Sequence, residues 1–124
     1  MRAGKLARFL SSLAVIALLA GCGGGQRDAP LESFTAEEIY KRGEFELETS
    51  RKSDEAARLF GEVERLYPYS EWAKRALIMQ AFAYHSARDY PNSRASAQRY
   101  IDFYPLDADA AYARLLRAGV VVRD

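Results

Sequence analysis

The chain has 124 residues, 49% of them hydrophobic and 28% charged, with a formal net charge of +1. Such a chain has room for one small globular domain. Three of its basic residues, Arg2, Lys5 and Arg8, lie at the amino terminus, and the rest of the chain carries a formal charge of −2. This balance excludes the strongly basic surface that nucleic-acid binding requires, so we expect no nucleic-acid partner.

The first 21 residues have the pattern of a secretory signal. Three basic residues precede an uncharged, mostly apolar run at residues 9–20. This run is too short for a bilayer-spanning helix, which needs ~20 residues. Residues 19–22, Leu-Ala-Gly-Cys, resemble the lipobox of bacterial lipoproteins, in which the cysteine becomes the first residue after cleavage. We therefore predict a lipoprotein signal peptide over residues 1–21.

Cys22 is the single cysteine of the chain, so it has no disulfide partner. The resemblance to a lipobox implies that Cys22 carries S-diacylglycerol and N-palmitoyl groups, and we expect no other cofactor. Two or more acyl chains anchor a protein stably, whereas one binds only marginally. Gly23 follows the cysteine where inner-membrane retention uses Asp. We therefore expect a lipid anchor in the cell outer membrane, on its periplasmic face.

Residues 22–33 are expected to form a lipidated flexible tether. Three successive glycines at positions 23–25 and Pro30 leave little apolar area to bury. The glycines do not form a phosphate-binding loop, because no strand pattern precedes them and no Lys-Ser/Thr pair follows. The folded domain is therefore expected to begin at residue 34.

Residues 34–68 have the pattern of a helix pair. Thr35 and Glu38 form a capping-box motif, which predicts a helix from there to about Thr49. A tight turn follows at residues 50–53, and a second helix with a broad apolar face should end at Tyr67 because Pro68 cannot continue it.

Residues 69–105 repeat this arrangement. Ser70 can cap a helix that runs to about residue 87, and a turn at residues 88–91 leads to another helix ending at Tyr104. Pro105 closes this unit 37 residues after Pro68 closes the first. A period near 34 residues with a closing proline is the tetratricopeptide (TPR) pattern. An unrelated pair of helical hairpins is the alternative.

A third unit begins at residue 106, where Asp107 is expected to cap a fifth helix. The units together predict an all-α fold, a TPR-like α-solenoid of antiparallel helix pairs with about two and a half repeats. Residues 106–124 would be the start of a truncated third repeat. Val120, Val121 and Val122 in this last segment suit a helix poorly.

A binding surface is expected on the concave side of such a solenoid, where the first helix of each pair lies. The TPR pattern places four residues there, as a partner or peptide groove: Arg75, Ile78, Phe82 and His85. Phe82 would anchor an extended peptide, or else it packs on a neighbouring helix. The same pattern assigns other residues of this helix to the core: Ala76, Leu77, Ala81 and Tyr84.

The sequence shows no constellation typical of catalysis. His85 is the single histidine and has neither a nearby cysteine nor a carboxylate pair one turn away, so a metal site or a general base is not expected. The serines of the second unit lack the G-x-S-x-G elbow of a nucleophile. We therefore predict that the chain is not an enzyme.

The combined pattern resembles the BamD family, the TPR lipoproteins of the outer-membrane β-barrel assembly machinery. The resemblance is carried by Cys22 and by residues 38–40, 67–73, 89–90 and 100–105. It implies a non-enzymatic scaffold of the Bam complex whose partners are a BamA-like barrel protein, other Bam lipoproteins and unfolded outer-membrane proteins. Members carry about five repeats, more than this chain contains. Their third repeat continues with an aromatic-rich run, so the resemblance implies that residues after about Ala113 are not the family's sequence and arise from a frameshift.

Two other functions are compatible with the residues. The first is another TPR lipoprotein that mediates protein interactions in peptidoglycan or envelope organisation. The second is a small subunit of an envelope enzyme, which would show hydrolytic activity dependent on His85 or a serine.

Overall fold

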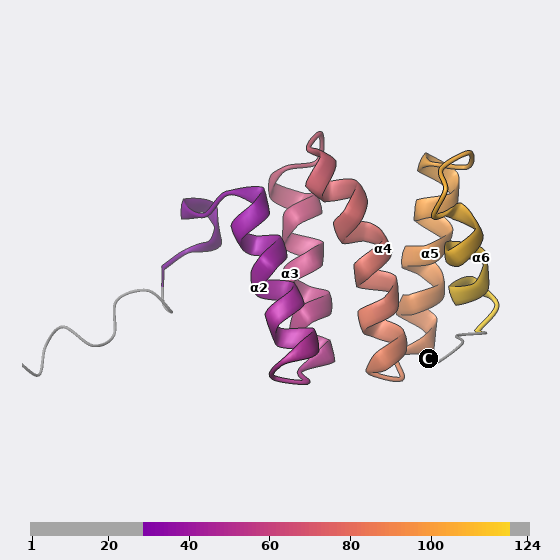
Figure 1. Cartoon of the computed structure of the whole chain (residues 1–124), viewed down its shortest axis with the longest axis horizontal. Coiled ribbons are helices and arrows are strands. Elements are labelled where there is room, and N and C mark those ends of the chain that lie inside the picture. Colours follow the sequence, from indigo (N-terminus) through magenta and orange to yellow (C-terminus); the bar gives the residue numbers. More distant parts are fainter. Residues whose placement is uncertain (1–28, 120–124) are drawn as a thin grey trace, which may run out of the picture. The chain divides into compact units, whose positions relative to one another are not determined.

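The computed structural model describes residues 29–119, and all regular structure within them is helical. A short 3-10 helix precedes five α-helices: η1 (Leu31–Ser33), α2 (Ala36–Glu48), α3 (Ser53–Leu66), α4 (Glu71–Ser86), α5 (Tyr90–Phe103) and α6 (Ala110–Arg117). Each α-helix packs against the next, and α4 also contacts both α2 and α6. Figure 1 shows the helices side by side with alternating direction. The predicted all-α, TPR-like solenoid is therefore confirmed.

Local capping explains where the first helix of each pair begins. The hydroxyl of Thr35 accepts a hydrogen bond from the Glu38 amide at 3.2 Å, and the Glu38 carboxylate accepts one from the Thr35 amide at 2.7 Å. This predicted capping box satisfies two backbone donors that the helix itself cannot pair. At α4, the Ser70 hydroxyl accepts from the Ala73 amide at 3.1 Å. The chain thus leaves α3 at Pro68 and starts α4 three residues later.

The first hydrophobic cluster lies between α2, α3 and one face of α4. Phe60 is fully buried in it, and Gly43 of α2 makes room for its ring, because a Cβ atom at Gly43 would lie only 2.8 Å from Phe60 Cε1. The Tyr40 ring lies 5.3 Å from the Phe60 ring and 5.1 Å from the Trp72 ring, measured between centroids. These tilted aromatic contacts join both helices of the first pair to the corner.

The second hydrophobic cluster lies between α4, α5 and α6. Buried hydroxyl and amide groups of α4 and α5 lie beside it. Ser93 donates to the Ala81 carbonyl at 2.8 Å, and Ser96 donates to Gln80 Oε1 at 3.1 Å. Gln80 Nε2 in turn donates to the Ala57 carbonyl of α3 at 3.2 Å. Because each of these groups has a partner, the polar atoms are buried without an unpaired donor or acceptor among them.

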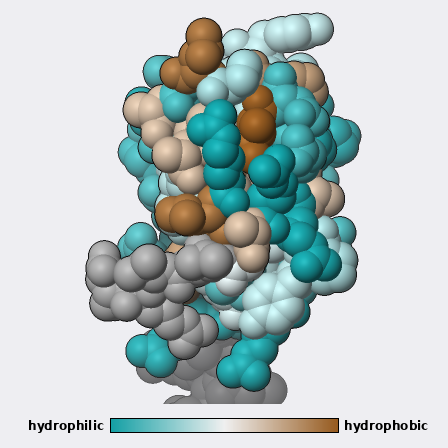
Figure 2. Space-filling view, turned by 90° about the vertical axis from the view of Figure 1, so that its right-hand side faces the viewer, coloured by the Kyte–Doolittle hydropathy of each residue, from teal (hydrophilic) through white to brown (hydrophobic). Residues whose placement is uncertain are grey.

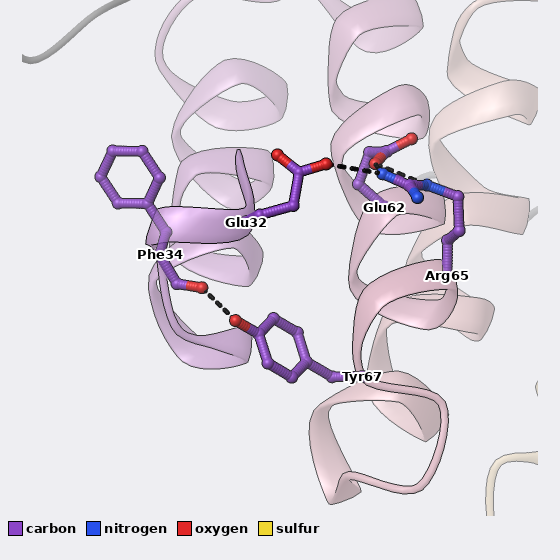
Figure 3. A network of polar contacts seen from close by, with 5 residues as sticks. All are labelled: Glu32, Phe34, Glu62, Arg65 and Tyr67. Carbon is purple, nitrogen blue, oxygen red and sulfur yellow. Dashed lines mark hydrogen bonds and ion pairs between the residues drawn. The ribbon is translucent and has the colours of Figure 1, made fainter. Parts of the chain in front are cut away.

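The amino-terminal lead into α2 forms the 3-10 helix η1, so regular structure begins within the last three residues of the predicted tether. Leu31 and Phe34 pack against the first cluster. The Tyr67 hydroxyl donates to the Phe34 carbonyl, and Arg65 pairs with Glu32 at 3.4 Å, as Figure 3 shows. The apolar side chains and the tyrosine hydrogen bond fix this segment to the end of α3. Residues 1–28, with the predicted signal peptide and Cys22, lie outside the described residues.

The start of α6 also differs from the prediction. Asp109 occupies the N-cap position and makes no side-chain cap, whereas Asp107 turns toward α4 and α5. Its carboxylate accepts a hydrogen bond from the Tyr100 hydroxyl at 2.7 Å and pairs with Lys74. Asp107 therefore joins the loop before α6 to α4 and α5, and it does not occupy the N-cap position of α6. Beyond it, Leu116 is fully buried in the second cluster, so α6 packs well past residue 113.

Candidate partner-binding surface

Helix α4 carries the four residues that the sequence places in a groove. Their spacings of three and four residues put them along one face of the helix. Ten residues separate Arg75 from His85, which corresponds to about 15 Å along the axis. The four side chains therefore form a stripe and do not converge on one point. Since α4 contacts α2 on one side and α6 on the other, both helices flank this stripe.

Arg75 lies at the end of the stripe nearest the corner and is exposed to solvent. Its guanidinium stacks over the Trp72 ring at 5.0 Å and lies 4.0 Å from the Glu71 carboxylate. On helix α2, burial and, to a lesser extent, the negative charge of Glu44 raise the pKa of Tyr40 to about 12. The surface here thus offers an exposed cation beside the acidic side chain of Glu71, whereas Tyr40 is buried in the first cluster.

Ile78 and Phe82 occupy the middle of the stripe, and they differ in accessibility. Ile78 is only 8% exposed and belongs to the second cluster, so it supports the surface from below and offers no contact to a partner. Phe82 is partly buried and packs against the same cluster. Part of its ring is thus held by the core and part is open. The groove itself stays a prediction.

His85 lies at the other end of the stripe, near the turn into α5. Its ring meets the Tyr90 ring edge-on, with centroids 5.2 Å apart and an interplanar angle of 71°. Tyr90 is 44% exposed and was read from the sequence only as a turn residue. The sequence does not predict this ring contact, because the contact depends on the geometry of the turn between α4 and α5.

Two cavities lie elsewhere on the helical domain, and the stripe lines neither. The larger, about 690 Å³, lies at the turn between α2 and α3; the smaller, about 250 Å³, is lined by residues of α3, α4 and α5. Across residues 29–119, no group of three or more His, Cys, Asp or Glu side chains is placed to hold a metal ion. In the same part of the chain, no helix combines the length and the apolar character needed to cross a membrane.

Comparison with known families now places the chain. The model of the YfiO family, described as outer membrane lipoprotein, matches residues 32–124. This range includes every α-helix described above. The chain belongs to the YfiO family of outer membrane lipoproteins. The resemblance found in the sequence is thereby confirmed.

Three relatives of this YfiO-family chain bear the name outer membrane protein assembly factor BamD. The protein of Caulobacter vibrioides is 34% identical over 117 residues, which cover 93% of this chain and 38% of the relative. That of Rickettsia prowazekii is 30% identical over 114 residues, covering 92% and 45%. That of Haemophilus influenzae is 27% identical over 104 residues, covering 84% and 38%. The chain thus spans about two fifths of the length of these relatives.

The family match also corrects one expectation about the end of the chain. It extends through residue 124, so the prediction that the family's sequence stops near Ala113 is wrong. The structure agrees with the longer match, because Leu116, three residues beyond Ala113, is fully buried in the second cluster. No solved structure matches the chain significantly.

Proposed function

We propose that this chain is a non-enzymatic scaffold that assists the assembly of β-barrel proteins into the outer membrane, held there through an acylated Cys22. The observation that carries the proposal is the YfiO match over residues 32–124, which coincides with the stacked helix pairs. The relatives named as assembly factors support the same role. Residues 34–68 and 69–105 would be its first two TPR-like repeats, and residues 106–124 would open a third.

The proposed anchor rests on the residues around Cys22. The alignment with the Caulobacter vibrioides protein leaves only about nine residues of this chain uncovered, so it must extend across position 22. Cys22 is the one residue of the chain that can form the thioether to diacylglycerol. Acylation at two sites of this residue would hold the domain at the periplasmic face of the outer membrane.

The anchor can be tested by Cys22→Ser, with Gly23→Ala as the matched control that keeps the thiol. We expect the serine variant to be released from membranes by a carbonate wash and to lack the mass of the acyl groups. The control should stay in the outer-membrane fraction. Retention and normal processing of the serine variant would refute the anchor.

The proposed partners are a BamA-like barrel protein, other Bam lipoproteins and unfolded outer-membrane proteins. Arg75, Phe82 and His85 would contact an extended segment of such a partner, since each has an exposed part. The Arg75 guanidinium can pair with a carboxylate, and the open part of the Phe82 ring can cover an apolar side chain. Ile78 would hold these residues in place from the core.

A photo-crosslinking amino acid tests this surface in cells. It would replace Phe82 or His85 in turn, with Arg94, exposed on α5, as the control position. We expect the two stripe positions to capture the large outer-membrane barrel protein or nascent barrel substrates, and position 94 to capture far less. Capture of peptidoglycan-associated proteins alone would instead favour another envelope lipoprotein function. Hydrolytic activity lost in His85→Ala would refute the non-enzymatic role.

A further inference from the structure

The two most exposed large hydrophobic side chains of the described residues occupy equivalent places in the two corners. Tyr69 directly follows Pro68 and is 100% exposed, and Leu106 directly follows Pro105 and is 98% exposed. Exposed hydrophobic residues are common when they are scattered singly. These two recur at the same step of the repeat, 37 residues apart, and neither contributes to packing within the fold.

Both corners lie at the end of the domain where the chain enters from the amino terminus. The Tyr67 hydroxyl joins the first corner to the Phe34 carbonyl in the lead segment (Figure 3). Lys74, in the first turn of α4, pairs with Asp107 in the loop between α5 and α6. Lead, first corner and second corner thus form one end of the helical domain, at the top of Figure 1.

The large hydrophobic side chains of this end are more exposed than those of the opposite end, where Phe45 is 56% and Tyr90 is 44% exposed. Besides Tyr69 and Leu106, the end with the two corners carries Phe103, which is largely exposed at the end of α5. Figure 2, turned about the vertical axis from Figure 1, shows a hydrophobic side chain at the top edge of the face formed by the last helices, and further hydrophobic side chains lower on the same face. At the opposite end, the turns present the exposed charged side chains Arg51 and Arg88.

We propose that the corner end of the domain docks on the phospholipid surface, with Tyr69 and Leu106 inserted at the level of the headgroups. This inference rests on the proposed lipid anchor at Cys22. Nine residues separate Cys22 from Leu31, and even fully extended they span at most ~32 Å. The lead that they reach is fixed to the corner end, so this end lies within that distance of the proposed anchor. Tyrosine suits the interface, because its ring is apolar and its hydroxyl stays hydrated.

The charges at this end select the kind of surface. Glu32 and Glu71 are exposed carboxylates there, paired with Arg65 and more loosely with Arg75. The end therefore has no surplus of positive charge with which to bind an anionic surface. A zwitterionic phospholipid surface carries no net charge and fits this balance, so the contact depends on the two apolar side chains.

Site-specific labels on the acylated chain test the docking. Because acylation occupies Cys22, the single cysteine, a new cysteine gives a unique thiol. Tyr69→Cys and Leu106→Cys would carry an environment-sensitive fluorophore, with Arg51→Cys and Arg88→Cys as controls at the opposite end. The proteins are reconstituted in phosphatidylcholine vesicles, with a second set containing anionic lipid. Circular dichroism melts confirm that each variant is folded.

We expect labels at positions 69 and 106 to be at least about threefold less accessible to an aqueous quencher than those at 51 and 88, with blue-shifted emission, in phosphatidylcholine. Vesicle-bound protein whose four labels are equally accessible would overturn the docking while leaving the anchor intact. Failure of every variant to bind vesicles would instead refute the anchor. Shielding that appears in detergent without vesicles and grows with protein concentration would overturn the docking in favour of contact with a second copy.

Discussion

The pair α2–α3 and the pair α4–α5 place their largest fully buried side chain at different positions. In the first pair it is Phe60, which fills the space left by Gly43. The residue 37 positions later is Ala97, and the large buried side chain is Tyr100, one turn nearer the corner. The shift brings the Tyr100 hydroxyl within reach of Asp107. The two repeats thus fill their cores with a large side chain at different positions. In the second repeat, this side chain also connects the core to the loop between α5 and α6.

The two ways of filling the core depend on different physical terms. The first pair depends on shape, because Phe60 and Gly43 are in direct contact and no polar group lies between them. The second pair relies in addition on buried hydrogen bonds of Ser93 and Ser96 and on the carboxylate of Asp107. We therefore expect the first pair to be sensitive to volume and the second to hydrogen-bonding capacity and acid.

The largest effect is expected for Phe60→Ala. Phe60 is fully buried, so the change removes its ring contacts and leaves a cavity, at a cost of about 3–5 kcal/mol in the free energy of unfolding. Urea denaturation followed by circular dichroism measures the loss. Phe45→Ala is the control, because Phe45 lies on α2 but is 56% exposed, and it should change stability by less than about 0.5 kcal/mol. Equal losses in both variants would refute the shape-dependent first core.

A somewhat smaller loss is expected for Trp72→Ala at the corner. Trp72 is partly buried, between the Tyr40 ring at 5.1 Å and the Arg75 guanidinium at 5.0 Å. Removing the indole should cost about 2–3 kcal/mol, because part of its surface is already in water. Trp72→Phe should recover about half of that loss. A denaturation midpoint unchanged by Trp72→Ala would show that the corner is not a packed junction.

The next effect tests the fit at Gly43. Alanine is the better helix former by about 1 kcal/mol, yet its Cβ would lie 2.8 Å from Phe60 Cε1. Overpacking of this kind costs about 1–3 kcal/mol, so we expect Gly43→Ala to be destabilising by about 1 kcal/mol net. In a Phe60→Leu background the clash is relieved and the same change should become neutral or stabilising. Additive effects of the two changes would contradict the contact.

The features that could be predicted from the sequence are those that neighbouring residues determine. The Thr35 capping box, the Ser70 cap and the breaks at Pro68 and Pro105 act within four residues, and the helices begin and end close to the expected positions. The family likewise followed from short motifs, each of which is made of neighbouring residues. For such features, local chemistry leaves few alternatives.

The features that the sequence did not predict depend on distant residues. Asp107 pairs with Lys74, 33 positions away, and its carboxylate accepts from the Asp109 amide without occupying the N-cap position of α6. Tyr67 and Phe34 are equally far apart, and their hydrogen bond orders the end of the expected tether. In the candidate site, the burial of Ile78 depends on how α5 and α6 cover α4. Whether Arg75, Phe82 and His85 bind a partner stays a prediction.

A smaller effect is expected for the buried hydrogen bonds of the second pair. Ser96→Ala removes the donor to Gln80 Oε1 and leaves that buried oxygen unpaired, at a cost of about 1–2 kcal/mol. Replacing both partners by apolar groups should cost less, so Ser96→Ala combined with Gln80→Met should be more stable than the sum of the single changes. Urea denaturation of the four proteins of this cycle measures the difference. Strict additivity would show that the two side chains are not coupled.

The smallest effect is expected at Asp107, and pH reveals it. The Lys74 ammonium, followed by the Tyr100 hydroxyl and the Asp109 amide, lowers the pKa of Asp107 from 3.8 to about 2. A carboxylate whose pKa is lower in the folded chain stabilises the fold above its unfolded pKa, and this contribution disappears as the pH falls from about 4 to about 2. Asp107→Asn should therefore be less stable than the parent chain at pH 6 and nearly equal to it at pH 2. Tyr100→Phe, which keeps the Lys74 pair, should show only part of this convergence. Urea midpoints at intervals between pH 6 and pH 2 measure it, and a constant gap between the parent and Asp107→Asn would rule out an ionised Asp107 as the link between the second core and its loop.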